Sequence, residues 1–110
     1  METKSSEQVG SRLLFEDERI RLWELSVAPN ESLDEHIHRL NYAYFVTQGG
    51  LLRFADVDNP SEFNDVQFTD NQVAFIPVSE EGRVDKRLTN VGENHHRNYI
   101  IEVKKAASQS

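Results

Sequence analysis

Short runs of β-forming residues alternate with turn signals throughout this chain, and no segment keeps a sustained helical period. Turn formers recur at short intervals, as at Ala28-Pro29-Asn30, Gly49-Gly50 and Asp70-Asn71. The runs between them are rich in aromatic and β-branched residues, which suit a pleated, half-buried surface. This spacing is typical of an all-β sandwich or barrel with roughly eight or nine short strands.

Most of the runs predicted as strands are followed within two residues by proline, glycine, asparagine or aspartate, and Gly49-Gly50 joins two of them into a hairpin. A further strand is expected at His36-Ile37-His38. The other predicted strands are 19–27, 42–47, 51–55, 66–68, 73–76, 83–89 and 98–103.

Length and composition favour one folded domain. The chain has 110 residues, of which 37% are hydrophobic and 28% charged, well above the hydrophobic content of a disordered chain. We expect residues 12–104 to form the domain between polar, flexible ends at 1–11 and 105–110. Trp23 is expected in the core or at a dimer contact.

The chain's charge and the absence of apolar stretches argue against several classes of protein. A net charge of −7 repels phosphate backbones, so nucleic acid is not an expected partner. No run of eighteen apolar residues is present, and the first ten residues lack a signal-peptide core. The absence of cysteine suits a reducing compartment, so we expect a cytoplasmic protein without a membrane partner.

The sharpest local feature is the pair His36 and His38. Residues two apart on a strand point to the same face, about 7 Å apart along the chain, so both imidazoles can serve one metal ion. A metal normally needs three or more protein ligands, however, and an isolated His-x-His pair is more often a polar pair on a solvated strand.

The surrounding sequence resembles the cupin motifs. Residues 29–49, PNESLDEHIHRLNYAYFVTQG, are similar to the first motif, with His36, His38 and Gly49 in their places. Residues 71–90 match the second motif more loosely, through Pro77 and Asn90. The likeness covers about residues 12–104 and extends to short stand-alone bacterial cupins, some labelled β-alanine degradation proteins. It implies a cupin-type double-stranded β-helix, a jelly-roll barrel.

In the family that this sequence resembles, two histidines and a glutamate of the first motif and a histidine of the second bind a divalent metal, commonly iron, manganese, nickel or zinc. In this sequence the position of the glutamate ligand is occupied by Tyr42 or, if the motif has the longer of its two spacings, by Ala43. The position of the histidine ligand of the second motif is occupied by Lys86. Asn30 and Asn71 take two glycine places, and asparagine tolerates the left-handed backbone of tight turns.

Three functions therefore remain open. In the first, the metal site is degenerate, and Tyr42, Lys86 and Tyr44 bind a small anionic metabolite. In the second, His36 and His38 still hold a metal with a non-standard third ligand, in an enzyme of dioxygenase, isomerase or lyase type. In the third, the barrel is a non-catalytic oligomerisation module.

Two of the predicted site residues, Lys86 and His96, are also compatible with a position on the solvated surface. Lysine is rarely buried, so Lys86 is equally expected to point to solvent. In His95-His96 adjacent side chains face opposite ways, so at most one turns inward, and a solvated pair is the commoner case. If His96 does turn inward, it is a candidate third metal ligand. The resemblance further implies a homodimer, since short stand-alone cupins usually pair through their sheets.

Overall fold

Strands account for all the regular structure in the computed structural model, which describes residues 8–105. Among these residues there is no helix, and hence none that could cross a membrane. The strands are β1 Arg12–Glu16, β2 Ile20–Val27, β3 Ser32–Leu33, β4 His36–His38, β5 Asn41–Gln48, β6 Gly50–Ala55, β7 Phe63–Phe68, β8 Val73–Ile76, β9 Arg83–Asp85, β10 Arg87–Asn90 and β11 His96–Val103.

The predicted strands are confirmed, although β7 begins at Phe63 and β11 at His96, ahead of the predicted starts at 66 and 98. Three further differences concern which strands are present. The run 83–89 is divided at Lys86 into β9 and β10, while β1 and β3 were not predicted. Strand β1 contains Leu13, Leu14 and Phe15 without polar alternation, and β3 is only two residues long, so neither carries a period-two signal.

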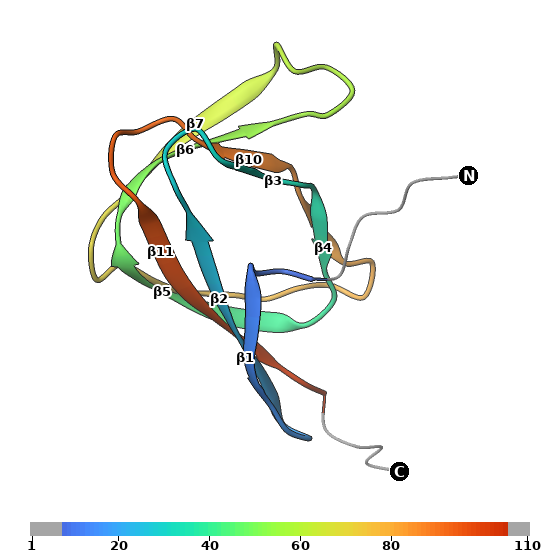
Figure 1. Ribbon diagram of the computed structural model, residues 1–110. Coiled ribbons are helices and arrows are strands. Elements are labelled where there is room, and N and C mark those ends of the chain that lie inside the picture. The colour runs from blue at the N-terminus through green and yellow to red at the C-terminus, as the bar shows by residue number, and fades with distance from the viewer. Residues whose placement is uncertain (1–7, 106–110) are drawn as a thin grey trace.

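Three antiparallel sheets build an open barrel (Figure 1). The first has the strand order β1-β2-β11-β5-β8, the second β3-β10-β6-β7, and the third is the pair β4-β9. Figure 1 shows β4 at one side of the barrel, between the two larger sheets. Because both predicted motifs contribute to the small sheet, its two strands bring together residues that lie far apart in the sequence.

The core lies between the two larger sheets. Alternate residues of β2 point inward, so that Trp23, Leu25 and Val27 are buried while their neighbours are less so. From the opposite sheet, Leu52 and Leu88 pack against them. Val9 also joins this core with 1% of its surface exposed, so packing begins before the predicted boundary at residue 12. Residues 1–7 and 106–110 of the predicted ends lie outside the described residues.

Two asparagines form the turns expected of them. Asn30 has a φ of 70° and Asn71 a φ of 69°, both in the left-handed region that asparagine enters more readily than most residues. The first turn leads into β3 and β4, and the second joins β7 to β8. The two motifs therefore keep their turns without glycine.

Candidate metal centre and ligand cavity

Strand pairing creates a buried site on the small sheet. In the β4–β9 register His36 lies opposite Asp85 and His38 opposite Arg83. Period-two alternation turns both imidazoles to the inner face, where His36 is 5% and His38 1% exposed. Ile37, between them, is less buried. The expectation that both imidazoles share one face is confirmed, and that face is interior rather than solvated.

Three potential ligand atoms converge at this point. The Nε2 atoms of His36 and His38 lie 3.1 Å apart, and Oδ2 of Asp85 lies 3.3 Å from the first and 3.0 Å from the second. Among the described residues, this is the group of histidine and carboxylate side chains placed to hold a metal ion.

The spacing of these atoms fits a metal ion. Atoms at adjacent positions of an octahedral ion lie about 3.0 Å apart when the bonds are about 2.1 Å long, and about 3.4 Å apart around a tetrahedral ion. Two imidazoles with one carboxylate are a donor set used by non-haem iron, and they also suit manganese, nickel and zinc. Nitrogen lone pairs and a carboxylate this close repel one another unless a proton or a cation lies between them.

Asp85 is ionised in this setting. Burial alone would raise the pKa of its carboxyl group, but hydrogen bonds from His36 and His38 outweigh burial and hold the pKa well below its usual range. Its second oxygen, Oδ1, accepts from Nε of Arg83 at 3.3 Å. Asp85 is therefore a charged ligand at any physiological pH, with Oδ2 directed toward the imidazoles.

Tyr42 supports the site from one side. Its ring stacks on that of His38 with centroids 4.0 Å apart and planes 14° apart. Burial, and then the charge of Asp85, raise the pKa of the Tyr42 hydroxyl, so it stays a neutral phenol and a hydrogen-bond donor. The Nδ1 atom of His38 has no hydrogen-bond partner among residues 8–105, so this ring is oriented by the stacking and by the contacts of its Nε2 atom with Asp85 and His36.

A cavity of about 480 Å³ opens beside these residues. His36, His38 and Asp85 line it, as do the predicted ligand-binding residues Tyr42, Tyr44 and Lys86. Much of the remaining wall is apolar and includes Leu25, Leu52, Phe54, Val66, Phe68, Ile76, Leu88 and Ile100. The interior of the barrel is therefore not filled by side chains.

Lys86 lies at this cavity but is exposed. It falls between β9 and β10 and makes no ion pair within the described part of the chain, while its neighbour Asp85 supplies the inward carboxylate. Counting back from Asn90 in the motif points to Lys86, one residue away from Asp85. The sequence contains one indication of Asp85: it is the acidic residue nearest to the position where the second cupin motif has its histidine. The register between β4 and β9 then determines that its side chain points inward.

His96 turns inward but does not join the site. It has 0% exposure and lies against Asn98 and the ring of Phe68, outside the group formed by His36, His38 and Asp85. Burial lowers its pKa to about 4, although the backbone of Gly49 opposes this shift.

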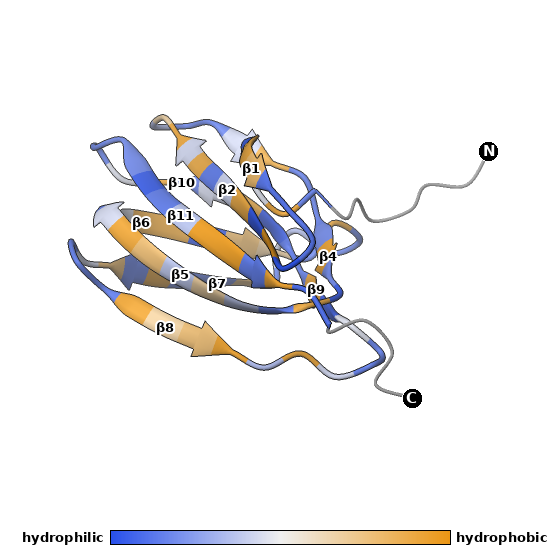
Figure 2. Cartoon of the chain, turned by 90° about the horizontal axis from the view of Figure 1, so that it is seen from below, coloured by the Kyte–Doolittle hydropathy of each residue, from blue (hydrophilic) through white to orange (hydrophobic). Residues whose placement is uncertain are grey.

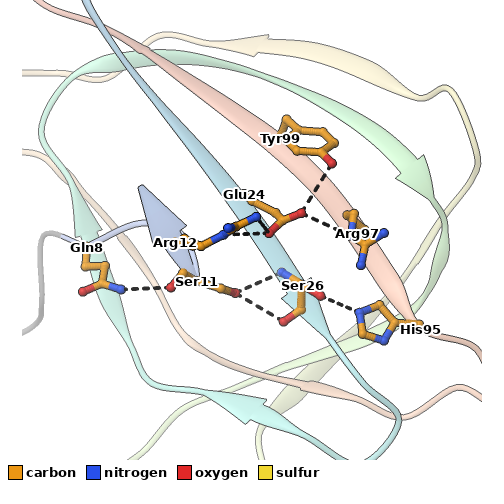
Figure 3. A network of polar contacts seen from close by, with 8 residues as sticks. All are labelled: Gln8, Ser11, Arg12, Glu24, Ser26, His95, Arg97 and Tyr99. Atoms are coloured by element: carbon orange, nitrogen blue, oxygen red, sulfur yellow. Dashed lines mark hydrogen bonds and ion pairs between the residues drawn. The ribbon is translucent and has the colours of Figure 1, made fainter. Parts of the chain in front are cut away.

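The neighbour of His96 points the other way, onto the outer face. Nε2 of His95 lies 2.5 Å from Oγ of Ser26, within the polar network of Figure 3. In the same network Ser11 and Ser26 bond to each other, and Arg12 bonds to Glu24, which attaches the N-terminal segment to β2. The opposed directions expected for the histidine pair are thus observed.

Solved structures show which fold this is. A cupin domain from Bordetella pertussis Tohama I aligns with a TM-score of 0.70 at 17% identity, covering 94% of this chain and 100% of that one. An RmlC-like cupin family protein with a double-stranded β-helix fold, from Methanocaldococcus jannaschii, has a TM-score of 0.60 at 10% identity, covering 94% and 86%. A cupin superfamily protein from Desulfitobacterium hafniense DCB-2 has a TM-score of 0.58 at 18% identity, covering 96% and 84%.

The chain is therefore a small cupin-fold protein, a double-stranded β-helix, as the resemblance in its motifs implied. No protein-family model and no curated protein matches it. At these low identities the likeness concerns the fold, and a fold hosts many activities. The function has to be argued from the site.

Proposed function

We propose that this protein binds a divalent transition-metal ion through His36, His38 and Asp85 and uses it to hold a small anionic metabolite in the barrel. The observation that carries the proposal is the convergence of two Nε2 atoms and one Oδ2 atom within 3.3 Å of one another. Asp85 then takes the place of the non-standard third ligand. When bound, the ion would act as a Lewis acid toward an oxygen of the metabolite.

Charge favours an anion as the metabolite. Two neutral imidazoles and one carboxylate carry a charge of −1, so a divalent ion leaves the site with a net positive charge. Lys86 adds a further positive charge at the same cavity, and the neutral Tyr42 hydroxyl is a donor suited to a carboxylate oxygen. The apolar wall accommodates a hydrocarbon body. A small carboxylate with an apolar chain combines these features.

Replacing Asp85 tests the metal ligand set. Asp85→Asn keeps the size of the side chain but replaces a charged ligand oxygen with a neutral one, so we expect metal affinity to fall by about 100-fold or more. The measurement is titration of metal-free protein with Mn²⁺, Ni²⁺ and Zn²⁺ by calorimetry. Because Nδ1 of His38 accepts or donates no hydrogen bond within residues 8–105, the wild-type affinity should itself be modest.

Lys86→Met is the matched control, one residue along the chain. It keeps an unbranched side chain without the charge, so metal affinity should be unchanged while affinity for small carboxylates such as hexanoate falls about fivefold or more. Equal metal affinity in Asp85→Asn and wild type would overturn the ligand assignment. Loss of metal binding in Lys86→Met would instead place the lysine at the ion.

We also propose that the protein forms a homodimer through the outer face of its five-stranded sheet. A row of directly paired residues crosses all five strands of that face: Phe15, Leu22, Ile101, Ala43 and Phe75. Of these, Phe15 is 50% and Phe75 58% exposed. Figure 2 shows the edge strand β8, to which Phe75 belongs, coloured as hydrophobic. A face of this composition is unusual on a solvated monomer.

A charge placed in this row should prevent pairing. For Phe75→Lys/Ile101→Lys we expect the mass from light scattering to fall from two chains to one at micromolar concentration, because two copies of the new charge would meet in a symmetric interface. Val57→Lys changes an equally exposed apolar residue in a loop and should leave the mass unchanged. A monomeric wild type would contradict the dimer.

A further inference from the structure

One cavity-lining amide has a polar atom without a hydrogen-bond partner in the part of the chain that the structure describes. Asn98 lies on the inward face of β11, paired with Leu25 of β2 and Val46 of β5. It is 7% exposed and lines the same cavity as the candidate metal ligands. Its Oδ1 atom is buried without a hydrogen-bond partner among the described residues.

The nitrogen end of this amide faces His96. The Nδ2 group of Asn98 donates to Nε2 of His96 at 2.8 Å, so this imidazole nitrogen accepts and carries no proton. His96 is fully buried and stays neutral at physiological pH, since burial lowers its pKa to about 4. One N–H of the amide is therefore used by His96, and the oxygen remains available as an acceptor.

The unpaired Oδ1 atom of Asn98 in the cavity wall favours ligands that can donate a hydrogen bond to it. In the free protein, water can donate to Oδ1, but a ligand of matching size expels that water. A ligand that brings its own hydroxyl or N–H group replaces the lost hydrogen bond. A ligand without a donor leaves the oxygen buried and unpaired, which weakens its binding.

The hydroxyl group of Tyr44, also in the cavity wall, is a hydrogen-bond donor and so complements the acceptor at Asn98. The hydroxyl of Tyr44 accepts from Nε2 of Gln72 at 3.2 Å, which leaves its own O–H free to donate. The cavity thus offers one acceptor at Asn98 and one donor at Tyr44. A hydroxyl group on the ligand can use both roles, whereas an apolar carbon can use neither.

We infer that Asn98 is the residue that determines ligand specificity, and that its Oδ1 accepts a hydrogen bond from a hydroxyl or N–H group of the bound metabolite. The ligand class is then a small carboxylate that carries a donor on its chain, a hydroxy acid or an amino acid. The inference rests on the proposed function in taking this cavity as the ligand site and the ligand as a carboxylate; the requirement for a donor rests on Asn98.

The test compares ligands that differ by one donor. Hexanoate and its 2-, 3-, 4- and 5-hydroxy derivatives are titrated against wild type and Asn98→Leu, each with Ni²⁺ and after chelation. We expect at least one hydroxy acid to bind wild type about tenfold more tightly than hexanoate, a preference that falls to about one in Asn98→Leu. Hexanoate itself should bind the variant no more weakly than wild type.

Two further variants keep the result interpretable. Asn98→Asp retains an oxygen acceptor and should retain the preference, even if its charge weakens every member of the series. Asn64→Leu removes an exposed asparagine from the same cavity wall and should also retain it. Circular dichroism and the metal stoichiometry of Asn98→Leu verify that fold and ion site are intact.

The inference fails if wild type binds none of the hydroxy acids more tightly than hexanoate, or if the preference survives in Asn98→Leu. Failure of the proposed metal site would look different. In that case no ion binds to wild type, while a hydroxyl preference measured after chelation would still depend on Asn98.

Discussion

A His36→Ala/His38→Ala variant is expected to bind no metal ion above background, whereas the wild type binds close to one equivalent. Both imidazoles direct Nε2 to the same point, so their removal leaves Asp85 as the remaining protein ligand of the group. One carboxylate does not retain a transition metal against water, and affinity should fall by about 1,000-fold or more. Metal content by plasma mass spectrometry, after incubation with iron, manganese, nickel or zinc, measures this.

His95→Ala is the control for the double variant. His95 is also a histidine, but it bonds to Ser26 on the outer face and does not line the cavity. Its replacement should leave the stoichiometry unchanged. Because the double variant removes two buried side chains, a His36→Gln/His38→Gln form, closer in volume, distinguishes lost ligands from a lost fold. Retention of a full equivalent by both forms would exclude this site as the metal centre.

Gly49→Ala is expected to destabilise the fold by about 3 kcal/mol or more, because overpacking against backbone atoms cannot relax locally. A Cβ atom at Gly49 would lie 2.3 Å from the carbonyl oxygen of Phe68 and 2.9 Å from Cα of Thr69. Both contacts are with backbone, where the chain passes from β7 toward β8. Urea unfolding followed by tryptophan fluorescence measures the loss, with Trp23 as the single reporter.

Gly92→Ala provides the comparison at a less crowded glycine. Its Cβ would meet the backbone nitrogen of Leu51 at 3.3 Å, a contact that a shift of a few tenths of an ångström relieves. We expect it to cost about 1 kcal/mol or less. Similar losses in the two variants would show that close backbone approach is not the reason for glycine at position 49.

The sequence predicted the parts of this protein that depend on local geometry. Alternation and turn residues located most strands, and Val73–Ile76 matches its predicted range. Asparagine at positions 30 and 71 was expected to form left-handed turns, and it does. His36 and His38 share one face because residues two apart on a strand always do. Each of these follows from a few consecutive residues.

The residues that complete the site were not predictable in the same way. Asp85 meets His38 across 47 positions in sequence, and motif counting pointed to Lys86, one residue away. A displacement of one residue reverses the face to which a strand side chain points. Only the pairing of β4 with β9 determines that Asp85 points inward.

Sequence alone therefore determined that this chain is a small all-β protein with two histidines on one face of a strand, because strand period and turn conformation are local properties. The resemblance of its motifs added the cupin type. Tertiary structure decided that Asp85 joins the pair, that His96 supports Asn98, and that the interior remains open. These features depend on the register between strands that are distant in sequence and on the volume that their side chains leave unfilled. Neither the register nor the unfilled volume can be read from a short run of residues.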